Sequence, residues 1–356
     1  MNEKKKKNTI GSIVKKVLLL ILETVLLLVI TLYGVMFVLV KGPSVTARNM
    51  FVKSVRETSA IGFLANLYLT PEQIAGIELS GRELELSPQD NSLVEINAST
   101  AAQGEPDEWG LVDEDGDGII VEEVKGSSYS GYMMVVKDPS RIAVGFNKKI
   151  GYKGYTVEQY VHAYDAVAGV NGGGFMDDNG AGDGSEPDTL LVYCGQIECG
   201  WQGSRYGFVG IDKDYRLRVD CQTTQEIEEA GIQFGCCYGP ILVKDGKILI
   251  SEGDSGGVNP RTAIGQRSDG AILLLVIDGR HVASLGASYL DLAEIMVRYG
   301  AVNAGNMDGG SSSLMYYQDE YVNNKAAVIG VRPIPTAWLV LKEGVTLTAD
   351  FKPELK

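Results

Sequence analysis

The stretch Ala271–Ile277 reads AILLLVI and is followed at once by Asp278-Gly279-Arg280. Seven consecutive apolar residues predict a strand buried on both faces, because a strand with one solvated face would alternate apolar and polar residues. Shorter β-like runs, separated by Gly and Asp turns, are Tyr132–Val136, Arg141–Val144 and Gly239–Val243. Strands outnumber helical patterns, which predicts an α+β fold with a mixed, largely antiparallel sheet flanked by helices.

Local turn and helix signals support this fold class. Lys244–Lys247 places Asp-Gly between two apolar runs and predicts a hairpin. A helix is expected over Val157–Val167. A clearer one is expected over Ser288–Tyr299, with a capping box to Asp291 and a stop at Gly300.

The N-terminus predicts one transmembrane helix before this domain. Lys4–Lys7, Lys15 and Lys16 form a basic tail, residues 1–16, ahead of the apolar run Val17–Val40. That run would make a helix about 36 Å long, enough to cross a hydrocarbon core of roughly 30 Å. The alternative is a cleaved signal peptide, since Val45–Ala47 has small residues in cleavage-compatible positions.

Positive charge before the span places the N-terminus in the cytoplasm. We therefore expect a single-pass protein of the cell membrane whose main domain is extracellular. Residues 41–110 are expected to form a stalk or accessory segment, with a helix start at Thr70-Pro71 and a polar loop over Ser87–Asp107. Residues 111–356 are expected to form the main domain.

Charge and cysteine content restrict the partners and cofactors. The chain has 32 basic and 46 acidic residues, and beyond residue 16 the remaining 26 basic and 45 acidic residues leave a formal charge of −19. This excess of acid argues against nucleic acid as a partner. Five cysteines and two histidines lack the spacing of a structural zinc site. Cys194 and Cys199 are close enough in sequence for a hairpin disulfide, and Cys236 and Cys237 are adjacent.

A short acidic stretch is the candidate metal site. Asp113, Asp115 and Asp117 alternate before Gly118, and alternate carboxylates can converge on a hard cation such as Ca²⁺. An EF-hand would need Glu where Val124 stands, so a solvated acidic turn is the alternative, and no cofactor is required by the pattern.

Three glycine-rich clusters carry the candidate chemistry. They are NGGGF at 171–175, NPRTAIG at 259–265 with IDGR at 277–280, and NMDGGSSSLMYY at 306–317. Glycines let backbone N–H groups approach an anion or a sugar, Arg suits phosphate, and Ser hydroxyls donate to oxygens. Each cluster alone also fits an ordinary surface turn.

Together, in this order and spacing, the clusters resemble the phosphodiester glycosidase family, over about Leu111–Val340. Val331–Pro333 resembles the family's closing Arg element. Some members remove N-acetylglucosamine from phosphodiesters, and bacterial relatives are labelled exopolysaccharide-biosynthesis proteins. The first motif departs by a third Gly, and in the last motif Ser311 replaces a Gly.

The resemblance implies hydrolysis of a sugar-1-phosphodiester in an envelope glycan, with a phosphate-containing glycan or cell-wall polymer as partner. It implies Asp308 as the first candidate for the catalytic carboxylate and Asp278 as the second. Predicted substrate-binding residues are Arg261 and Arg280 for the phosphate, with Asn171, Gly172, Gly173, Thr262, Gly309, Gly310, Ser311 and Ser312 lining the site. The competing functions are a non-catalytic glycan-binding or exopolysaccharide-assembly protein and a calcium-dependent adhesive module.

Overall fold

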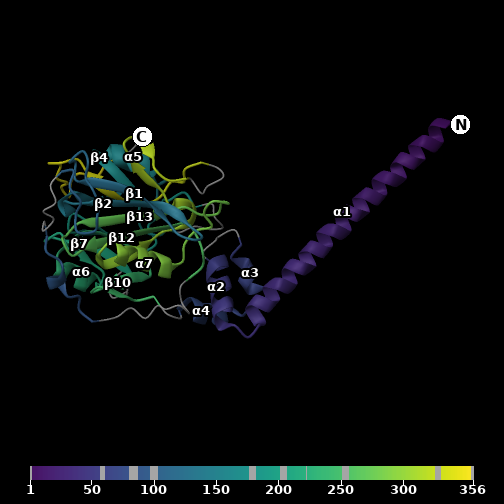
Figure 1. Ribbon diagram of the computed structural model, residues 1–356, viewed down its shortest axis with the longest axis horizontal. Helices are drawn as coiled ribbons and strands as arrows, with labels where there is room; N and C mark the ends of the chain where they lie inside the picture. The colour runs from purple at the N-terminus through teal and green to yellow at the C-terminus, as the bar shows by residue number, and fades with distance from the viewer. Residues whose placement is uncertain are drawn as a thin grey trace.

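The computed structural model describes residues 2–56, 61–79, 87–96, 103–175, 182–200, 207–221, 223–250, 256–324 and 330–353. A long helix, α1 (Asn2–Lys41), extends away from a globular domain. Three short helices, α2 (Val45–Arg56), α3 (Phe63–Asn66) and α4 (Pro71–Leu79), lie where α1 meets that domain (Figure 1).

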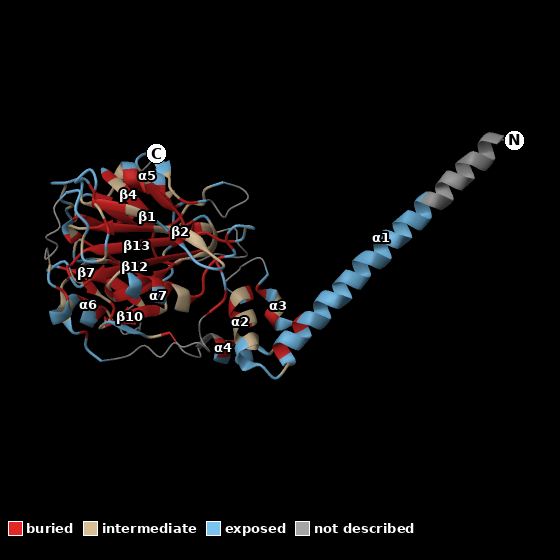
Figure 2. Ribbon diagram, in the orientation of Figure 1, coloured by how far each residue is buried: buried red, intermediate tan, exposed pale blue. Residues whose placement is uncertain are grey.

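Helix α1 is the candidate membrane span. Its segment Val14–Lys41 is 28 residues long and apolar enough to cross a bilayer, and a signal sequence would pass the same test. Within Val14–Lys41 nearly all side chains are exposed, as the pale blue part of this ribbon in Figure 2 shows.

The globular domain contains three sheets in the described residues, and every strand pairing among them is antiparallel. The first sheet has seven strands in the order β1-β2-β13-β12-β14-β10-β11. In chain order its strands are β1 (Ile119–Lys125), β2 (Ser130–Val136), β10 (Ile241–Lys244), β11 (Lys247–Ile248), β12 (Arg261–Arg267), β13 (Ile272–Ile277) and β14 (Ala301–Met307).

Two five-stranded sheets pack beside it. One has the order β16-β15-β4-β17-β3, with β3 (Ile142–Phe146), β4 (Ala166–Asn171), β15 (Met315–Tyr317), β16 (Glu320–Tyr321) and β17 (Thr336–Leu341). The other has the order β6-β5-β9-β7-β8, with β5 (Leu191–Tyr193), β6 (Gln196–Cys199), β7 (Phe208–Asp212), β8 (Leu217–Arg218) and β9 (Ile232–Cys237). The α+β class and the antiparallel character are confirmed, with three sheets in place of one.

Strand β13 shows why the sheets associate. Its alternate residues Ile272, Leu274 and Val276 join a core shared with strands of both smaller sheets. Leu273, Leu275 and Ile277 face the opposite side and pack with helix α7 (Tyr289–Arg298). All six side chains are fully buried, as the apolar run predicts.

The helices begin at side-chain caps, as their sequences indicate. The Ser288–Asp291 capping box opens α7, and Thr70 and Gln73 exchange bonds at the start of α4. Helix α6 (Thr224–Ala230) packs against the third sheet, in contact with β9. The Lys244–Lys247 hairpin is also confirmed, with Asp245 and Gly246 both at positive φ.

The helix expected over Val157–Val167 is shorter than predicted. Helix α5 ends at Ala163, and Asp165, at φ 51°, turns the chain into β4. The run from Ala166 is short and apolar, and its pattern alone does not distinguish a helix from a buried strand. This run forms a strand because it pairs with β15 on one side and with β17 on the other.

A disulfide between Cys194 and Cys199, for which their spacing is short enough, is absent, and all five cysteines are free. Cys194 lies in the turn between β5 and β6, whereas Cys199 lies opposite Leu191 further along the hairpin. A disulfide needs the two Cα atoms within about 7 Å, and this register directs the two cysteines to different ends of the hairpin.

Residues 103–110, just before Leu111, pack on the end of β12. Arg267 is fully buried, forms a 2.7 Å ion pair with Asp107 and also pairs with Asp269. Its guanidinium stacks on the Trp109 ring at 3.8 Å. Residues 103–110 therefore form part of the packed domain.

Candidate active site

The three glycine-rich clusters meet at one end of the sheets. Strand pairing sets Arg261 opposite Ile277, Thr262 opposite Met307, and Asn171 opposite Ala337. Because the strands are antiparallel, the end of one lies beside the start of its neighbour. This brings together motifs up to 137 residues apart, as the contact between Asn171 and Asp308 shows.

Asn171 connects the clusters at this end. Its amide Nδ2 donates to the main-chain oxygen of Asp308 at 2.7 Å, and its Oδ1 accepts from Thr262 Oγ1 at 2.6 Å and from Leu314 N at 3.3 Å. Both Asn171 and Thr262 are fully buried. The geometry gives them a role in positioning the Asp308 turn, beneath the surface that a substrate would contact.

The glycines after Asn171 allow close backbone packing. Gly172 N donates to Thr336 O at 2.9 Å, and Gly172 O accepts from Asp308 N at 3.1 Å. A Cβ at Gly173 would lie 2.5 Å from Cys237 O, so a side chain has no room there. The cluster thus joins the second and third sheets directly below the Asp308 turn.

The turn after β14 carries the first candidate carboxylate. Asp308 is half-buried, and its Oδ1 accepts from Gly309 N at 2.9 Å. Gly310, at φ 64°, donates its N–H to Pro260 O and opens a single 3₁₀ turn, Gly310–Ser312. The buried hydroxyls of Ser312 and Ser313 have no hydrogen-bond partner among the described residues. Buried polar groups without a partner are uncommon in native proteins, so this turn is polar beneath its surface.

Two arginines lie against consecutive residues of this turn. Arg280 is exposed, and its Nη2 is 3.1 Å from the position a Cβ would take at Gly310. Arg332 places Nη1 3.5 Å from Ser311 Oγ and stacks over the Phe175 ring at 4.6 Å. The structure therefore adds Arg332 and Phe175 to the predicted site. The sequence signals were the Val331–Pro333 element and the aromatic that ends the first motif.

Arg261, the other predicted phosphate ligand, is 2% exposed. Its Nη2 donates to Gly257 O at 2.6 Å, its Nε donates to Ala287 O at 3.2 Å, and its guanidinium stacks over Tyr289 at 4.0 Å. These contacts brace the loops beside the Asp308 turn.

Asp278, the second candidate carboxylate, is also buried and heavily bonded. It accepts from Asn323 Nδ2 at 3.0 Å, from Asn324 N at 3.0 Å and from Asn324 Nδ2 at 2.8 Å. Asn323 also donates to Ser313 O and accepts from Met315 N. Asp278 thus fixes the chain that follows the Asp308 turn, which leaves Asp308 as the more accessible acid of the two.

The acidic stretch lies elsewhere. Carboxylate oxygens of Asp113, Asp115 and Asp117 are within 4.8 Å of one another, close enough for one cation. Asp113 already pairs with Lys137 at 2.8 Å, and Asp117 accepts from Tyr317. The stretch leads into β1 at Ile119, which pairs with Val136, the residue of β2 farthest from the motif end. A calcium site here would therefore be separate from the candidate active site.

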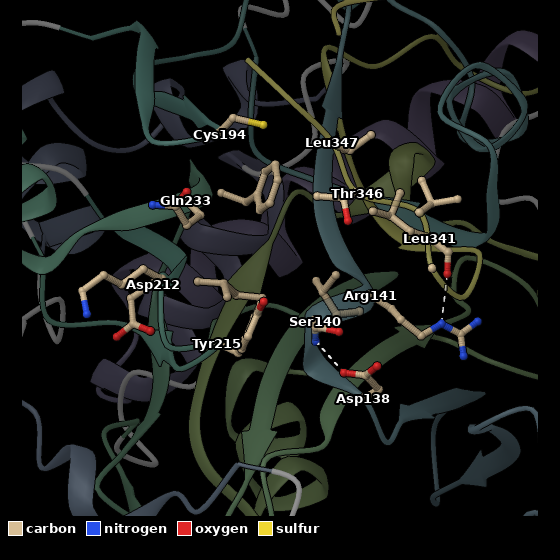
Figure 3. A pocket seen from close by; sticks show the side chains of 16 residues that line it. Asp138, Ser140, Arg141, Cys194, Asp212, Tyr215, Gln233, Leu341, Thr346 and Leu347 are labelled. Carbon is tan, nitrogen blue, oxygen red and sulfur yellow. Dashed lines mark hydrogen bonds between the residues drawn. The ribbon is translucent and has the colours of Figure 1, made fainter. Parts of the chain in front are cut away.

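A cavity of about 370 Å³ also lies away from the motifs (Figure 3). Leu341 in its lining ends β17, whose first residue, Thr336, is at the motif end. Arg141 in the lining is engaged by Leu341 O and Asp117 O. Burial raises the pKa of the Asp212 carboxyl, another lining residue.

Comparison with known proteins agrees with this arrangement. Residues 164–341, half of the chain, match the family described as phosphodiester glycosidase. The chain therefore belongs to the phosphodiester glycosidase family, and its fold supports a glycosidase-type function.

Two similar proteins bear on the resemblance. The SPbeta prophage-derived uncharacterized protein YomE of Bacillus subtilis is 36% identical over 164 residues, which are 45% of this chain and 25% of that protein. The match thus spans about a quarter of the curated relative's length. The structure of the zebrafish N-acetylglucosamine-1-phosphodiester alpha-N-acetylglucosaminidase catalytic domain, auto-inhibited by its pro-peptide, superimposes with a TM-score of 0.54 at 19% identity. It covers 69% of this chain and 88% of that one, a likeness of fold.

Proposed function

We propose that this protein is a membrane-anchored hydrolase of sugar-1-phosphodiesters. Water adds to the anomeric carbon, the bond from that carbon to the bridging oxygen breaks, and the phosphate leaves as a monoester that keeps the bridging oxygen. The products are a free sugar and a phosphomonoester. The observation that carries the proposal is the placement of two arginines and a carboxylate around one glycine-serine turn, in a chain of this family.

The phosphate is assigned to Arg280 and Arg332. Their guanidinium groups lie against Gly310 and Ser311, and guanidinium groups bind phosphate with charge-assisted hydrogen bonds. The half-buried Ser311, whose Oγ lies 3.5 Å from Arg332 Nη1, supplies a further hydroxyl in the same turn. In this assignment Arg332 takes the place of buried Arg261, which instead holds the neighbouring loops.

Asp308 is assigned as the catalytic carboxylate. The transition state carries oxocarbenium character at the anomeric carbon, and a carboxylate beside that carbon stabilises it or attacks it. Asp308 is the half-buried acid in the turn that holds the proposed phosphate contacts. Phosphate is a good leaving group once its charge is bound, so the mechanism places little demand on a general acid.

The substrate class is an envelope glycan that contains sugar–phosphate linkages. The location of the domain supports this class, because an outward-facing domain tethered by α1 would lie beside such polymers. The sugar and the polymer are left to a substrate panel.

The test is to identify which bond is broken. The full chain, purified in nanodiscs, is given a panel of synthetic sugar-1-phosphodiesters in water enriched in oxygen-18, and the products are analysed by mass spectrometry. The proposal expects a free sugar that carries the label and an unlabelled phosphomonoester. Label in the phosphate would show a phosphodiesterase, and intact diester with measurable binding would show a glycan-binding protein.

A further inference from the structure

Helices α2, α3 and α4 form a small module around the end of α1. They enclose a core of their own, made of Val52, Val55, Ala65, Ile74 and Ile77. Figure 1 shows this module between the long helix and the sheets. Its contacts with α1 fix where it would lie relative to a membrane.

Tyr68, just after α3, packs on the side of α1. Its hydroxyl donates to Tyr33 O at 2.9 Å, and its ring centroid is 5.0 Å from that of Tyr33 and 6.4 Å from that of Phe37. Tyr68 is buried together with Met36 and Val40. The module therefore lies alongside the last two turns of the apolar helix, where it would meet the bilayer.

The length of the apolar helix indicates where Tyr33 and Tyr68 lie relative to the bilayer. Val14–Lys41 has 28 residues, which make about 42 Å of helix, against a hydrocarbon core of roughly 30 Å. With Lys15 and Lys16 at the cytoplasmic boundary, Tyr33 lies about 27 Å further along the helix. Tyr33 and Tyr68 thus fall at the outer boundary, where Tyr is enriched in membrane proteins.

Around α3, large apolar side chains point away from the protein. Ile61 is 41% exposed, Phe63 is 58% exposed and Leu67 is 49% exposed. Phe63 and Leu67 are four residues apart and share one face of the turn. Residues 41–56 contain no acidic residue, and of their four basic residues Lys41 and Arg56 are exposed, Arg48 is half-buried and Lys53 is buried. An apolar face beside positive charge matches the acyl and headgroup layers of an anionic membrane.

We infer that α3 and its flanking turns insert into the outer interface of the membrane, with Ile61, Phe63 and Leu67 among the upper acyl chains. The bilayer is the favoured partner because this face is continuous with the span through the Tyr68–Tyr33 contact. A Cβ at Gly257 would lie 2.4 Å from that of Ser54 in α2, and Gly257 O accepts from Arg261. The module thereby holds the motif end of the domain near the membrane. The inference needs α1 to span, and it is independent of the proposed glycosidase activity.

The experiment introduces tryptophan into the full chain, reconstituted in nanodiscs of phosphatidylcholine and phosphatidylglycerol with bromine on the upper acyl carbons. The test variants are Phe63→Trp and Leu67→Trp. Tyr33→Trp is the control for the anchor. Tyr215→Trp is the control for the globular domain, since Tyr215 is 45% exposed in the lining of the distant cavity. Fluorescence is compared with unbrominated discs and with the parent, which supplies the background of its three native tryptophans.

The added emission of Phe63→Trp, Leu67→Trp and Tyr33→Trp should fall by roughly half in brominated discs, while that of Tyr215→Trp stays unchanged. Quenching of Tyr33→Trp without quenching of the two α3 variants would overturn the inference. The inference is also overturned if the emission of the two α3 variants depends on the number of chains per disc and not on bromine. In that case a second copy of the chain, and not the bilayer, would cover the apolar face of α3. If Tyr33→Trp is not quenched, α1 does not span the bilayer, and the inference, which needs that span, is overturned.

Discussion

The side-chain amide of Asn171 donates a 2.7 Å hydrogen bond to the main-chain oxygen of Asp308, across the boundary between two sheets. The same side chain accepts from Thr262 in β12. One buried asparagine therefore sets the position of the acid that we assign to catalysis.

Replacing this asparagine should cost both stability and activity. Asn171→Ala leaves the Thr262 hydroxyl and the Asp308 carbonyl without this partner, and we expect a loss of about 3 kcal/mol in the free energy of unfolding. Thr262→Val removes one of these bonds and should cost about 1 kcal/mol. Urea unfolding of both variants measures the difference. Equal losses would mean that the contacts of Asn171 with Asp308 and Leu314 contribute nothing.

A pair of glycine substitutions should distinguish the effect of backbone strain from an effect on phosphate binding. Gly310→Ala places a Cβ at φ 64°, 3.1 Å from Arg280 Nη2, whereas Gly246→Ala has φ 72° and open space. Both should lose about 1 kcal/mol of stability from backbone strain. Only Gly310→Ala should also raise KM, because it displaces the arginine. A parental KM in Gly310→Ala would argue against this turn as the phosphate site.

Arg280, which is exposed, and Arg332, which is half-buried, should matter for the phosphate. Arg280→Gln and Arg332→Gln each remove charge-assisted hydrogen bonds, worth about 2 kcal/mol or roughly 30-fold in kcat/KM. Arg298→Gln, on the exposed side of α7, serves as the matched control and should be unchanged. Steady-state kinetics on one diester tests all three. Our assignment fails should the control lose as much as the site variants.

The cysteines should be unreactive while the protein is folded. Burial raises the pKa of the Cys199 thiol to about 11 and the pKa values of Cys221 and Cys237 to about 12. At pH 7.5 fewer than about one in a thousand of these thiols would be ionised, and the thiolate is the reactive form. Reaction with iodoacetamide should thus be slow until pH rises toward 11.

Alkylation of the unfolded protein measures the number of free cysteines. In denaturant without reductant, mass spectrometry should find all five cysteines alkylated, since all five are free. Only three alkylated residues would instead show a disulfide, with Cys194 and Cys199 as the first pair to examine.

Much of the local structure could be predicted from sequence. The strand β13 and the caps of α7 are encoded by neighbouring residues, through an unbroken apolar run and a capping box. The division into three sheets depends on long-range pairing, such as that of Val170 in β4 with Trp338 in β17. No local pattern carries that information, and for the same reason the helix expected over Val157–Val167 includes the first two residues of β4.

The site shows the same limit. The three clusters lie together, as the bonds of Asn171 to Asp308 and Thr262 show. Whether an arginine faces substrate or the interior depends on packing, and the sequence placed Arg261 with Arg280 although Tyr289 covers Arg261. Likewise, the burial of Asp278 depends on Asn323 and Asn324, which lie 45 and 46 residues later and donate to its carboxylate.

The most direct test of the central claim is the turnover of Asp308→Asn. The full chain and the variant are given the sugar-1-phosphodiester that the parent cleaves fastest, and binding is measured alongside by calorimetry. Asp319→Asn, an exposed acid in the β15–β16 turn, serves as the charge-matched control. The account predicts parental turnover in the control and a loss of about a thousandfold or more in Asp308→Asn with binding retained. Parental turnover in Asp308→Asn, or binding without turnover in the parent, would contradict it.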